Sequence, residues 1–263
     1  SAREYLDHIL LENEVEVNVI HNTRDPYFGG YAPDCTSENL SRLRDVMRRT
    51  GADLGLSTDG DGDRPLIADE NGAPLRGDLI GLAAALMLKP DVVATPVSTN
   101  AAIDTRFGFD VRRTRIGSPH VIAAMQAEAE NRTVLGFEAN GGVLLHSDFI
   151  LGGKLLPALA TRDAILPTLC VPAYSVQQRL PLSALHEHLG LNHAASGLIR
   201  NRSGGWIDAF MASLEGDAGN LARLIRGLGP LVSVDRTDGL RCQLGGGNSV
   251  HFRPSGNAPE LRV

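Results

Sequence analysis

The segment from Thr58 to Arg64 places three aspartates at alternate positions, with glycine between them and an arginine directly after the last one. Crowded carboxylates need a compensating positive charge, and hard divalent cations prefer such oxygen ligands. The pattern therefore predicts a metal site at Asp59, Asp61 and Asp63. Mg²⁺ is the expected ion because it takes few protein oxygens and leaves positions for water or a substrate phosphoryl group. Arg64 is expected to hold the same phosphate.

Two alternatives for this loop stay open. An EF-hand calcium loop would place the aspartates at positions one, three and five and Glu70 at position twelve, but Arg64 occupies the sixth position, where a sharp turn needs glycine. Strands rather than helices are also expected on both sides. A solvated turn rich in Asp and Gly would need no ligand.

A second candidate loop lies near the C-terminus. It combines a guanidinium, a hydroxyl, a glycine N–H and a side-chain amide, at Arg253, Ser255, Gly256 and Asn257. These groups can converge on phosphate oxygens, so the loop predicts a phosphate-binding site. The alternative is a structural turn in which Arg253 forms a salt bridge.

A third loop, residues 136–142, presents an acid and an amide on glycine-rich backbone. The carboxylate of Glu138 accepts hydrogen bonds and the amide of Asn140 both donates and accepts, which suits sugar hydroxyls. Taken alone, the loop is at least as well explained by an ordinary turn.

Composition excludes several classes of function. The 263 residues carry a formal net charge of −6 and no block of Lys and Arg that could neutralise nucleic-acid phosphates. The longest apolar run, residues 79–88, is too short to span a bilayer, and residues 1–5 lack a signal-peptide pattern. We therefore expect a soluble, cytoplasmic protein with no nucleic-acid or membrane partner.

The elements that must position these loops follow from periodicity. Apolar residues at helical spacing predict a helix around residues 40–47, begun by a capping Ser37 and ended by Gly51. A strand at 53–57 then leads into the acidic loop, and a strand at 65–68 with a turn at 70–72 implies a hairpin.

Strands and helices alternate through the middle of the chain. Helices are expected at 78–87, 101–107 and 118–130 and strands at 92–94, 111–114 and 134–137. This order predicts a parallel sheet covered on both faces. From about Ser175 the pattern changes to short helices and then strands at 231–234, 240–243 and 249–252, which predicts a small α+β domain.

The three loops in this order, with Gly117-Ser118-Pro119-His120 before a helix, resemble the α-D-phosphohexomutases, the phosphomannomutase and phosphoglucomutase family. The resemblance covers nearly all of the chain. It implies part of a four-domain, heart-shaped α/β enzyme: two α/β/α phosphohexomutase-type domains followed by a smaller α+β C-terminal domain. Residues 1–75 would be domain II with the metal-binding loop, residues 76–174 domain III with the sugar-binding loop, and residues 175–263 domain IV with the phosphate-binding loop.

The resemblance also implies an activity. A phosphoserine would give its phosphoryl group to a hexose phosphate, a hexose 1,6-bisphosphate would turn around, and the serine would take back the other phosphate, which interconverts hexose 1-phosphate and hexose 6-phosphate. Mg²⁺ on the three aspartates would face the phosphoserine. The residues that would grip the substrate are His120, Glu138, Asn140 and Gly141 for the sugar and Arg253, Ser255, Gly256 and Asn257 for the phosphate that is not reacting.

The sequence departs from the family pattern in two places. No Ser-His-Asn-Pro-type segment precedes Asp59, so we expect a fragment that lacks the N-terminal phosphoserine domain of the same polypeptide and is inactive alone. Asn257 and Ala258 stand where many members carry Thr and Glu. A non-catalytic sugar-phosphate-binding protein therefore stays an alternative, as does an Mg-dependent phosphatase, although the latter needs a lysine-bearing helix where a hairpin is expected. On the resemblance alone mannose is favoured over glucose, with dual specificity close behind.

Overall fold

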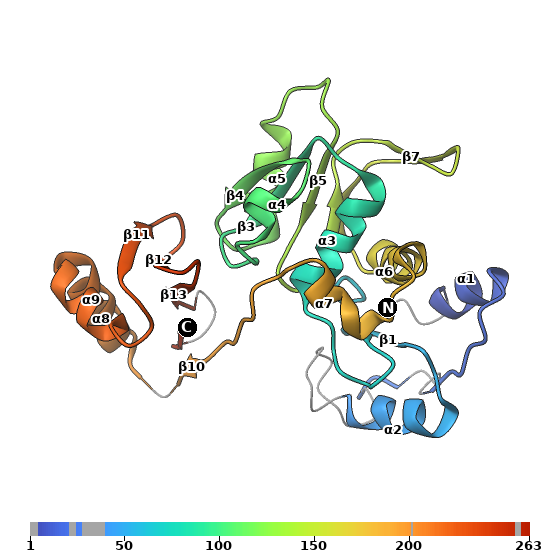
Figure 1. Ribbon diagram of the computed structural model, residues 1–263, viewed down its shortest axis with the longest axis horizontal. Helices are drawn as coiled ribbons and strands as arrows, with labels where there is room; N and C mark the ends of the chain where they lie inside the picture. The colour runs from blue at the N-terminus through green and yellow to red at the C-terminus, as the bar shows by residue number, and fades with distance from the viewer. Residues whose placement is uncertain (1–4, 21–24, 28–39, 201, 256–258) are drawn as a thin grey trace. The chain divides into compact units, whose positions relative to one another are not determined.

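The structure is a computed structural model that describes residues 5–20, 25–27, 40–200, 202–255 and 259–263. The chain divides into two compact units, one of residues 1–113 and 117–191 and the other of residues 114–116 and 192–263. Each unit is described by itself (Figure 1).

The larger unit contains helices and strands in alternation. In chain order they are α1 (Leu6–Glu12), α2 (Ser41–Thr50), β1 (Gly55–Thr58), β2 (Pro65–Ala68), α3 (Gly77–Leu88), β3 (Val92–Pro96), α4 (Ile103–Arg106), β4 (Asp110–Thr114), α5 (Ser118–Gln126), β5 (Val134–Phe137), β6 (Val143–Leu145), β7 (Phe149–Leu151), β8 (Lys154–Leu156), β9 (Leu159–Asp163), α6 (Ile165–Gln178), the 3-10 helix η3 (Leu182–Ala184) and α7 (Leu185–His188).

The first elements include the predicted helix, α2, and the predicted turn after β2, where Ala68 forms an antiparallel bridge with Pro74. Helix α2 ends at Gly51, whose φ of 68° is left-handed and suits glycine. Its predicted cap, Ser37, lies outside the described residues. β1 begins two residues later than predicted and pairs antiparallel with β2, with Thr58 opposite Pro65. This register closes the acidic loop at the end of the hairpin.

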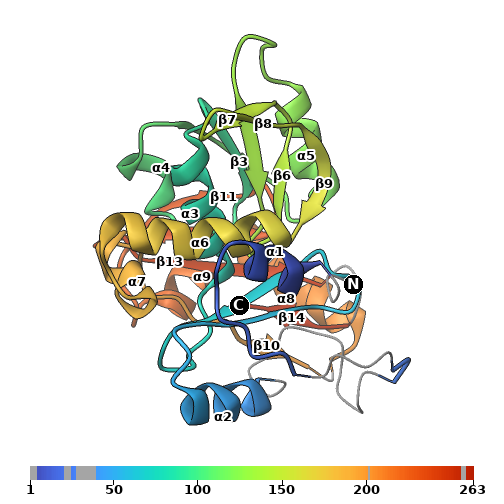
Figure 2. The ribbon, with the colours of Figure 1, turned by 90° about the vertical axis from the view of Figure 1, so that its right-hand side faces the viewer.

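The main sheet has the strand order β4-β3-β5-β6-β9. β3 and β5 are parallel, as predicted. β6 runs antiparallel to β5 and β9 antiparallel to β6, with β9 at the edge of the sheet (Figure 2). These two strands were not predicted, and they make the sheet mixed. The reason is local: the backbone of Glu138 pairs with that of Gly142 at 3.1 Å, which turns the chain directly back along β5.

Helices cover both faces of this sheet, as the alternation of strand residues requires. Val92 and Val134 pack with Val121 and Met125 of α5 on one face. On the other face, the neighbouring residues of the same strands belong to a larger apolar core built with α3 and α6. α3 is apolar on nearly all sides because it lies between the sheet and α6.

The smaller unit is an antiparallel sheet with two helices. Its elements are β10 (Leu198–Ile199), α8 (Gly204–Gly216), α9 (Ala218–Ile225), β11 (Leu231–Asp235), β12 (Leu240–Leu244), β13 (Ser249–Pro254) and β14 (Leu261–Arg262). The strand order is β10-β14-β13-β12-β11, and the three longest strands match the predicted ones. The α+β class of this unit is therefore confirmed, whereas the predicted division between residues 174 and 175 falls within α6.

Among the described residues, no helix is long and apolar enough to cross a membrane.

Candidate functional site

The acidic loop is organised by the side chain of its first aspartate. Asp59 Oδ1 accepts hydrogen bonds from the backbone N–H groups of Gly62, Asp63 and Arg64, each at 3.1 Å, and its Oδ2 accepts from Arg64 Nε. Gly62 has a φ of 79°, a conformation that a side chain would disfavour. The Asp-Gly alternation therefore folds the loop around one buried carboxylate, whose side chain is 0% exposed.

The same contacts keep Asp59 ionised. Burial alone would raise its pKa, but the hydrogen bonds that the Arg64 backbone and guanidinium donate, together with the positive charge of Arg64, outweigh burial, so the pKa lies below its usual value. A carboxylate with a lowered pKa suits a cation site, because the ionised form is the one that binds a cation.

The three predicted metal ligands come together. One carboxylate oxygen from each of Asp59, Asp61 and Asp63 lies within 4.8 Å of the others. Asp63 Oδ1 is buried, accepts no hydrogen bond and lies 3.8 Å from Arg64 Nε, so this oxygen is open to a bound cation. The donor set consists of carboxylate oxygens alone, so the residues fit a hard divalent ion such as Mg²⁺.

The sugar-loop residues form a tight turn at the end of β5. Gly141 N–H donates to the Glu138 carbonyl at 2.9 Å, and Gly142 N–H donates to Asn140 Oδ1 at 3.0 Å. Gly141 has a φ of 91°. A Cβ on Gly77, at the start of α3, would lie 2.3 Å from the Ala139 carbonyl oxygen, so glycine there lets the loop seat directly on the helix start.

The sugar loop and the acidic loop are neighbours. A Cβ placed on Gly141 would lie 3.2 Å from Pro65 of the acidic hairpin, and one on Gly142 would lie 3.0 Å from the Asp63 carbonyl oxygen. Two loops that are about 75 residues apart in the sequence therefore share one surface, as the resemblance implied.

Arg162 joins the two loops, and sequence reasoning missed it. It lies on β9 and pairs with Asp63 Oδ2 at 2.5 Å and with Glu138 Oε2 at 3.0 Å. Burial opposes the charge of Arg162, but the two carboxylates outweigh burial and raise its pKa. Arg162 belongs to no recognisable motif, because it reaches the site only through the antiparallel pairing of β6 with β9. The sequence offered one weak indication, an Arg-Asp pair ahead of an apolar helix.

We refer to the side chains of these two loops and their arginines as the acidic cluster. Its members are Asp59, Asp61, Asp63, Glu138, Arg64 and Arg162. Four carboxylates against two guanidinium groups give a formal charge of −2. A divalent cation would neutralise this charge.

His120 belongs to helix α5 of the larger unit. It is exposed on the first turn of α5, where its N–H donates to the Gly117 carbonyl at 3.0 Å. The described contacts do not join it to the sugar loop.

The phosphate-loop residues belong to the smaller unit. Arg253, on β13, pairs through Nε with Asp238 Oδ2 at 3.0 Å, and its side chain is 18% exposed. Ser255 N–H donates to the Glu260 carbonyl at 2.8 Å. Gly256 and Asn257 lie outside the described residues. The Arg253 salt bridge is the arrangement that the structural-turn alternative predicts.

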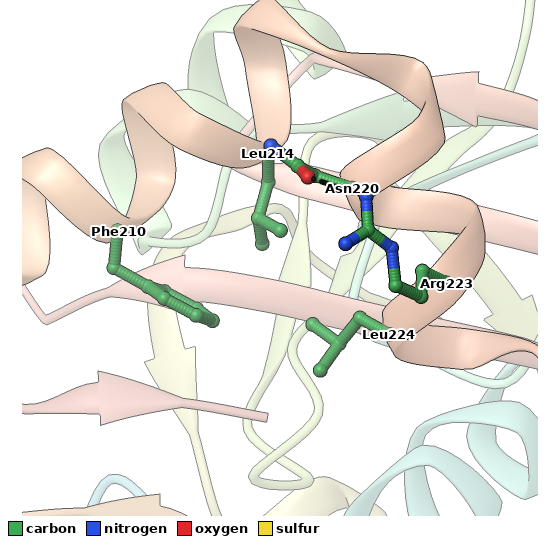
Figure 3. A pocket seen from close by; sticks show the side chains of 5 residues that line it. All are labelled: Phe210, Leu214, Asn220, Arg223 and Leu224. Atoms are coloured by element: carbon green, nitrogen blue, oxygen red, sulfur yellow. Dashed lines mark hydrogen bonds between the residues drawn. The ribbon is translucent and has the colours of Figure 1, made fainter.

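A separate hollow of about 420 Å³ lies between α8 and α9 of the smaller unit (Figure 3). Its lining residues are Phe210, Leu214, Asn220, Arg223 and Leu224. It contains none of the predicted site residues.

The structure also decides between alternatives for the acidic loop. Strands β1 and β2 flank it, and Glu70, which an EF-hand would use as its last ligand, instead accepts hydrogen bonds from the N–H and hydroxyl groups of Ser183. The calcium-loop alternative is therefore wrong. The hairpin after Asp63 is also confirmed, and it stands where a phosphatase would need a lysine-bearing helix.

The fold and these loops define an α/β protein in which an aspartate turn that could hold a cation lies beside the turn that bears Glu138 and Asn140. Two descriptions of known domains match the chain: phosphoglucomutase/phosphomannomutase alpha/beta/alpha domain II over residues 1–72, and domain III of the same family over residues 77–190. The chain belongs to the phosphoglucomutase/phosphomannomutase family, as the resemblance predicted.

Curated relatives agree with this assignment. The chain is 47% identical over 212 residues to a phosphomannomutase of Sinorhizobium fredii (strain NBRC 101917 / NGR234), covering 80% of this chain and 45% of that protein. It is 42% identical over 216 residues to a phosphomannomutase of Salmonella muenchen, covering 80% and 44%. The chain thus spans about half the length of the curated relatives it matches.

Solved structures share the fold. A phosphoglucomutase/phosphomannomutase family protein from Burkholderia thailandensis superimposes with a TM-score of 0.73 at 19% identity, over 99% of this chain and 53% of that chain. The N-acetylphosphoglucosamine mutase of Aspergillus fumigatus, solved in complex with GlcNAc-6P and magnesium, gives 0.53 at 17% identity, over 91% and 54%.

Proposed function

We propose that the full-length protein is a phosphohexomutase that interconverts hexose 1-phosphate and hexose 6-phosphate, with mannose phosphates as the favoured substrates. The observation that carries this proposal is the acidic cluster, in which an incompletely neutralised aspartate turn lies against the turn that bears Glu138 and Asn140. The family and its phosphomannomutase relatives support the substrate class.

In this proposal each segment has one task. Residues 1–75 present Asp59, Asp61 and Asp63 as ligands of Mg²⁺, which would supply a positive charge that polarises a phosphoryl group. Arg64 holds the reacting phosphate. The segment from residue 76, which we extend to Leu191 because the compact unit ends there, presents the sugar loop.

The sugar loop and the C-terminal segment hold the substrate. Glu138 accepts hydrogen bonds from hydroxyl groups, while Asn140 and the Gly141 backbone complete the turn and His120 lines the same wall. The phosphate that is not reacting is held by four residues of the C-terminal segment, Arg253, Ser255, Gly256 and Asn257. These four residues can bind the substrate in both orientations of the sugar, because the 1-phosphate and the 6-phosphate exchange places.

The phosphoserine of this cycle is expected outside the 263 residues, so the chain alone is expected to bind without turnover. Hexose 1,6-bisphosphate is the proposed intermediate and activator, and a cytoplasmic location suits an enzyme of sugar phosphates.

The test is to incubate the full-length protein with mannose 1-phosphate or glucose 1-phosphate, Mg²⁺ and a trace of hexose 1,6-bisphosphate, and to follow 6-phosphate formation. We expect product that depends on Mg²⁺ and is lost with a chelator. Binding of both ligands without any product would favour the non-catalytic alternative, and release of inorganic phosphate would favour a phosphatase.

A further inference from the structure

One guanidinium group contacts both loops of the acidic cluster. The two terminal nitrogens of Arg162 bind different carboxylates, Nη2 contacting Asp63 Oδ2 at 2.5 Å and Nη1 contacting Glu138 Oε2 at 3.0 Å. A guanidinium is planar and rigid, so the position of one carboxylate constrains the position of the other. The Glu138 side chain is only 6% exposed, which makes its charged partner necessary rather than incidental.

The backbone holds Arg162 firmly in place. β9 pairs with β6, with Val143 opposite Asp163, and β6 begins directly after the sugar loop. Asp163, the next residue, accepts hydrogen bonds from the N–H groups of Ile165 and Leu166 and so starts α6. Arg162 is therefore anchored by a strand on one side and a helix start on the other.

The stem of the arginine passes between the two loops. A Cβ on Gly142 would lie 3.1 Å from Arg162 Cδ and 3.0 Å from the Asp63 carbonyl oxygen, so glycine leaves the space that the arginine needs. A movement of either loop must then be accommodated by the same side chain.

We propose that Arg162 is a positioning residue that couples cation binding at the aspartates to sugar-phosphate binding at Glu138. This inference rests on the proposed function of the two loops. A dication on Asp63 shares that carboxylate with Arg162, which strengthens the hold of the guanidinium on Glu138 and fixes the sugar loop for its ligand. Because such coupling is reciprocal, the sugar phosphate tightens cation binding by the same factor.

The experiment measures the dissociation constant of Mg²⁺ by calorimetry, with and without saturating mannose 1-phosphate. The proteins are the 263-residue chain, Arg162→Gln, Arg162→Lys and the control Arg112→Gln, which removes an arginine charge outside the cluster. We expect the sugar phosphate to tighten Mg²⁺ binding at least about 5-fold in the unmodified chain and in the control. In Arg162→Gln the factor should fall below about 2-fold.

Arg162→Lys keeps the positive charge and is the second test if the glutamine variant does not fold. An ammonium is a point charge that cannot bridge both carboxylates as the fork does, so its coupling factor should also fall, to below about 3-fold. Folding of each variant is checked by circular dichroism.

Two results would overturn the inference alone. One is wild-type coupling in either folded variant, which would mean that the cation touches the sugar phosphate directly. The other is binding of both ligands to the unmodified chain with a factor near one. Failure of the unmodified chain to bind Mg²⁺ or mannose 1-phosphate would overturn the proposed function as well.

Discussion

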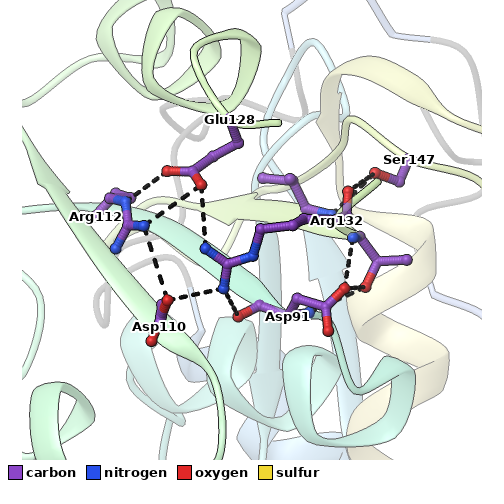
Figure 4. A network of polar contacts seen from close by, with 8 residues as sticks. Asp91, Asp110, Arg112, Glu128, Arg132 and Ser147 are labelled. Atoms are coloured by element: carbon purple, nitrogen blue, oxygen red, sulfur yellow. Dashed lines mark hydrogen bonds and ion pairs between the residues drawn. The ribbon is translucent and has the colours of Figure 1, made fainter. Parts of the chain in front are cut away.

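Two clusters of arginines and carboxylates lie at opposite ends of the strands of the larger unit. The acidic cluster follows the ends of β1 and β5. The second cluster, which we call the strand-start network, lies where β3, β4 and β5 begin (Figure 4). Its members are Asp91, Asp110, Arg112, Glu128 and Arg132.

The strand-start network is nearly neutralised by its own contacts. Arg132 bonds Asp110 at 2.8 Å and the Asp91 backbone carbonyl at 3.1 Å. The Asp91 carboxylate accepts from the N–H and hydroxyl groups of Thr133 at 2.7 and 2.8 Å, and these bonds hold its pKa below the usual value. Three carboxylates face two arginines, so the formal charge is only −1.

The comparison shows that the same residue types can have different roles, depending on charge balance and burial. Asp110 is 59% exposed, whereas Asp59 is fully buried and Glu138 is 6% exposed. Surface ion pairs contribute little to stability and need no ligand. The acidic cluster has two more carboxylates than arginines, and one of its buried carboxylate oxygens, Asp63 Oδ1, accepts no hydrogen bond. These two features are the reason to expect a ligand at the acidic cluster.

The largest expected effect is a loss of enzymatic activity when the acidic cluster, but not the strand-start network, is mutated. Asp61→Asn in the full-length protein should lower turnover by at least about 10²-fold, because a cation supplies several kcal/mol and each 1.36 kcal/mol is tenfold. Asp61 is exposed, so the fold should survive. The assay is 6-phosphate formation, with Asp110→Asn as the matched control. Turnover equal in both variants would remove the metal hypothesis.

A smaller effect is expected at Arg253, whose salt bridge with Asp238 resembles the strand-start contacts while its proposed role resembles those of the acidic cluster. Arg253→Ala should raise KM about 10-fold with little change in kcat, because charged hydrogen bonds contribute about 1.5–3 kcal/mol. Asp238→Asn is the control. An unchanged KM in Arg253→Ala, with both variants destabilised equally, would make the pair purely structural.

Sequence predicted the parts of this molecule that depend on local pattern. The Asp-Gly alternation and the Gly51 stop signal are local, so the acidic loop and the end of α2 were predicted correctly. The pairing of β9 with β6 joins residues that are distant in the sequence, with Val143 opposite Asp163, and no periodicity of 3.6 or two reports such pairing. Arg162 was missed for that reason, and so was the Asp238 partner of Arg253.

The third prediction compares how much the two clusters contribute to the free energy of unfolding. Arg162→Gln should lower the free energy of unfolding of the 263-residue chain by about 1–3 kcal/mol at neutral pH, because it leaves the carboxylates of Asp63 and Glu138 without their shared partner. The estimate is below that for a fully buried pair because Arg162 is 26% exposed. Urea denaturation gives the value. A loss no larger than that of Arg112→Gln would mean that burial does not distinguish the clusters.

The smallest effect belongs to the strand-start network itself. Arg112→Gln removes the ion pair of Arg112 with Glu128 and the weaker one with Asp110 at 3.8 Å. The free energy of unfolding should fall by less than about 1 kcal/mol, because Arg112 is partly exposed and Glu128 keeps its pair with Arg132 at 3.4 Å. In 1 M NaCl the Debye length is about 3 Å, so the difference from the unmodified chain should shrink further. A loss above about 2 kcal/mol that persists in high salt would show that this network is a buried structural core, and the contrast with the acidic cluster would then rest on charge balance alone.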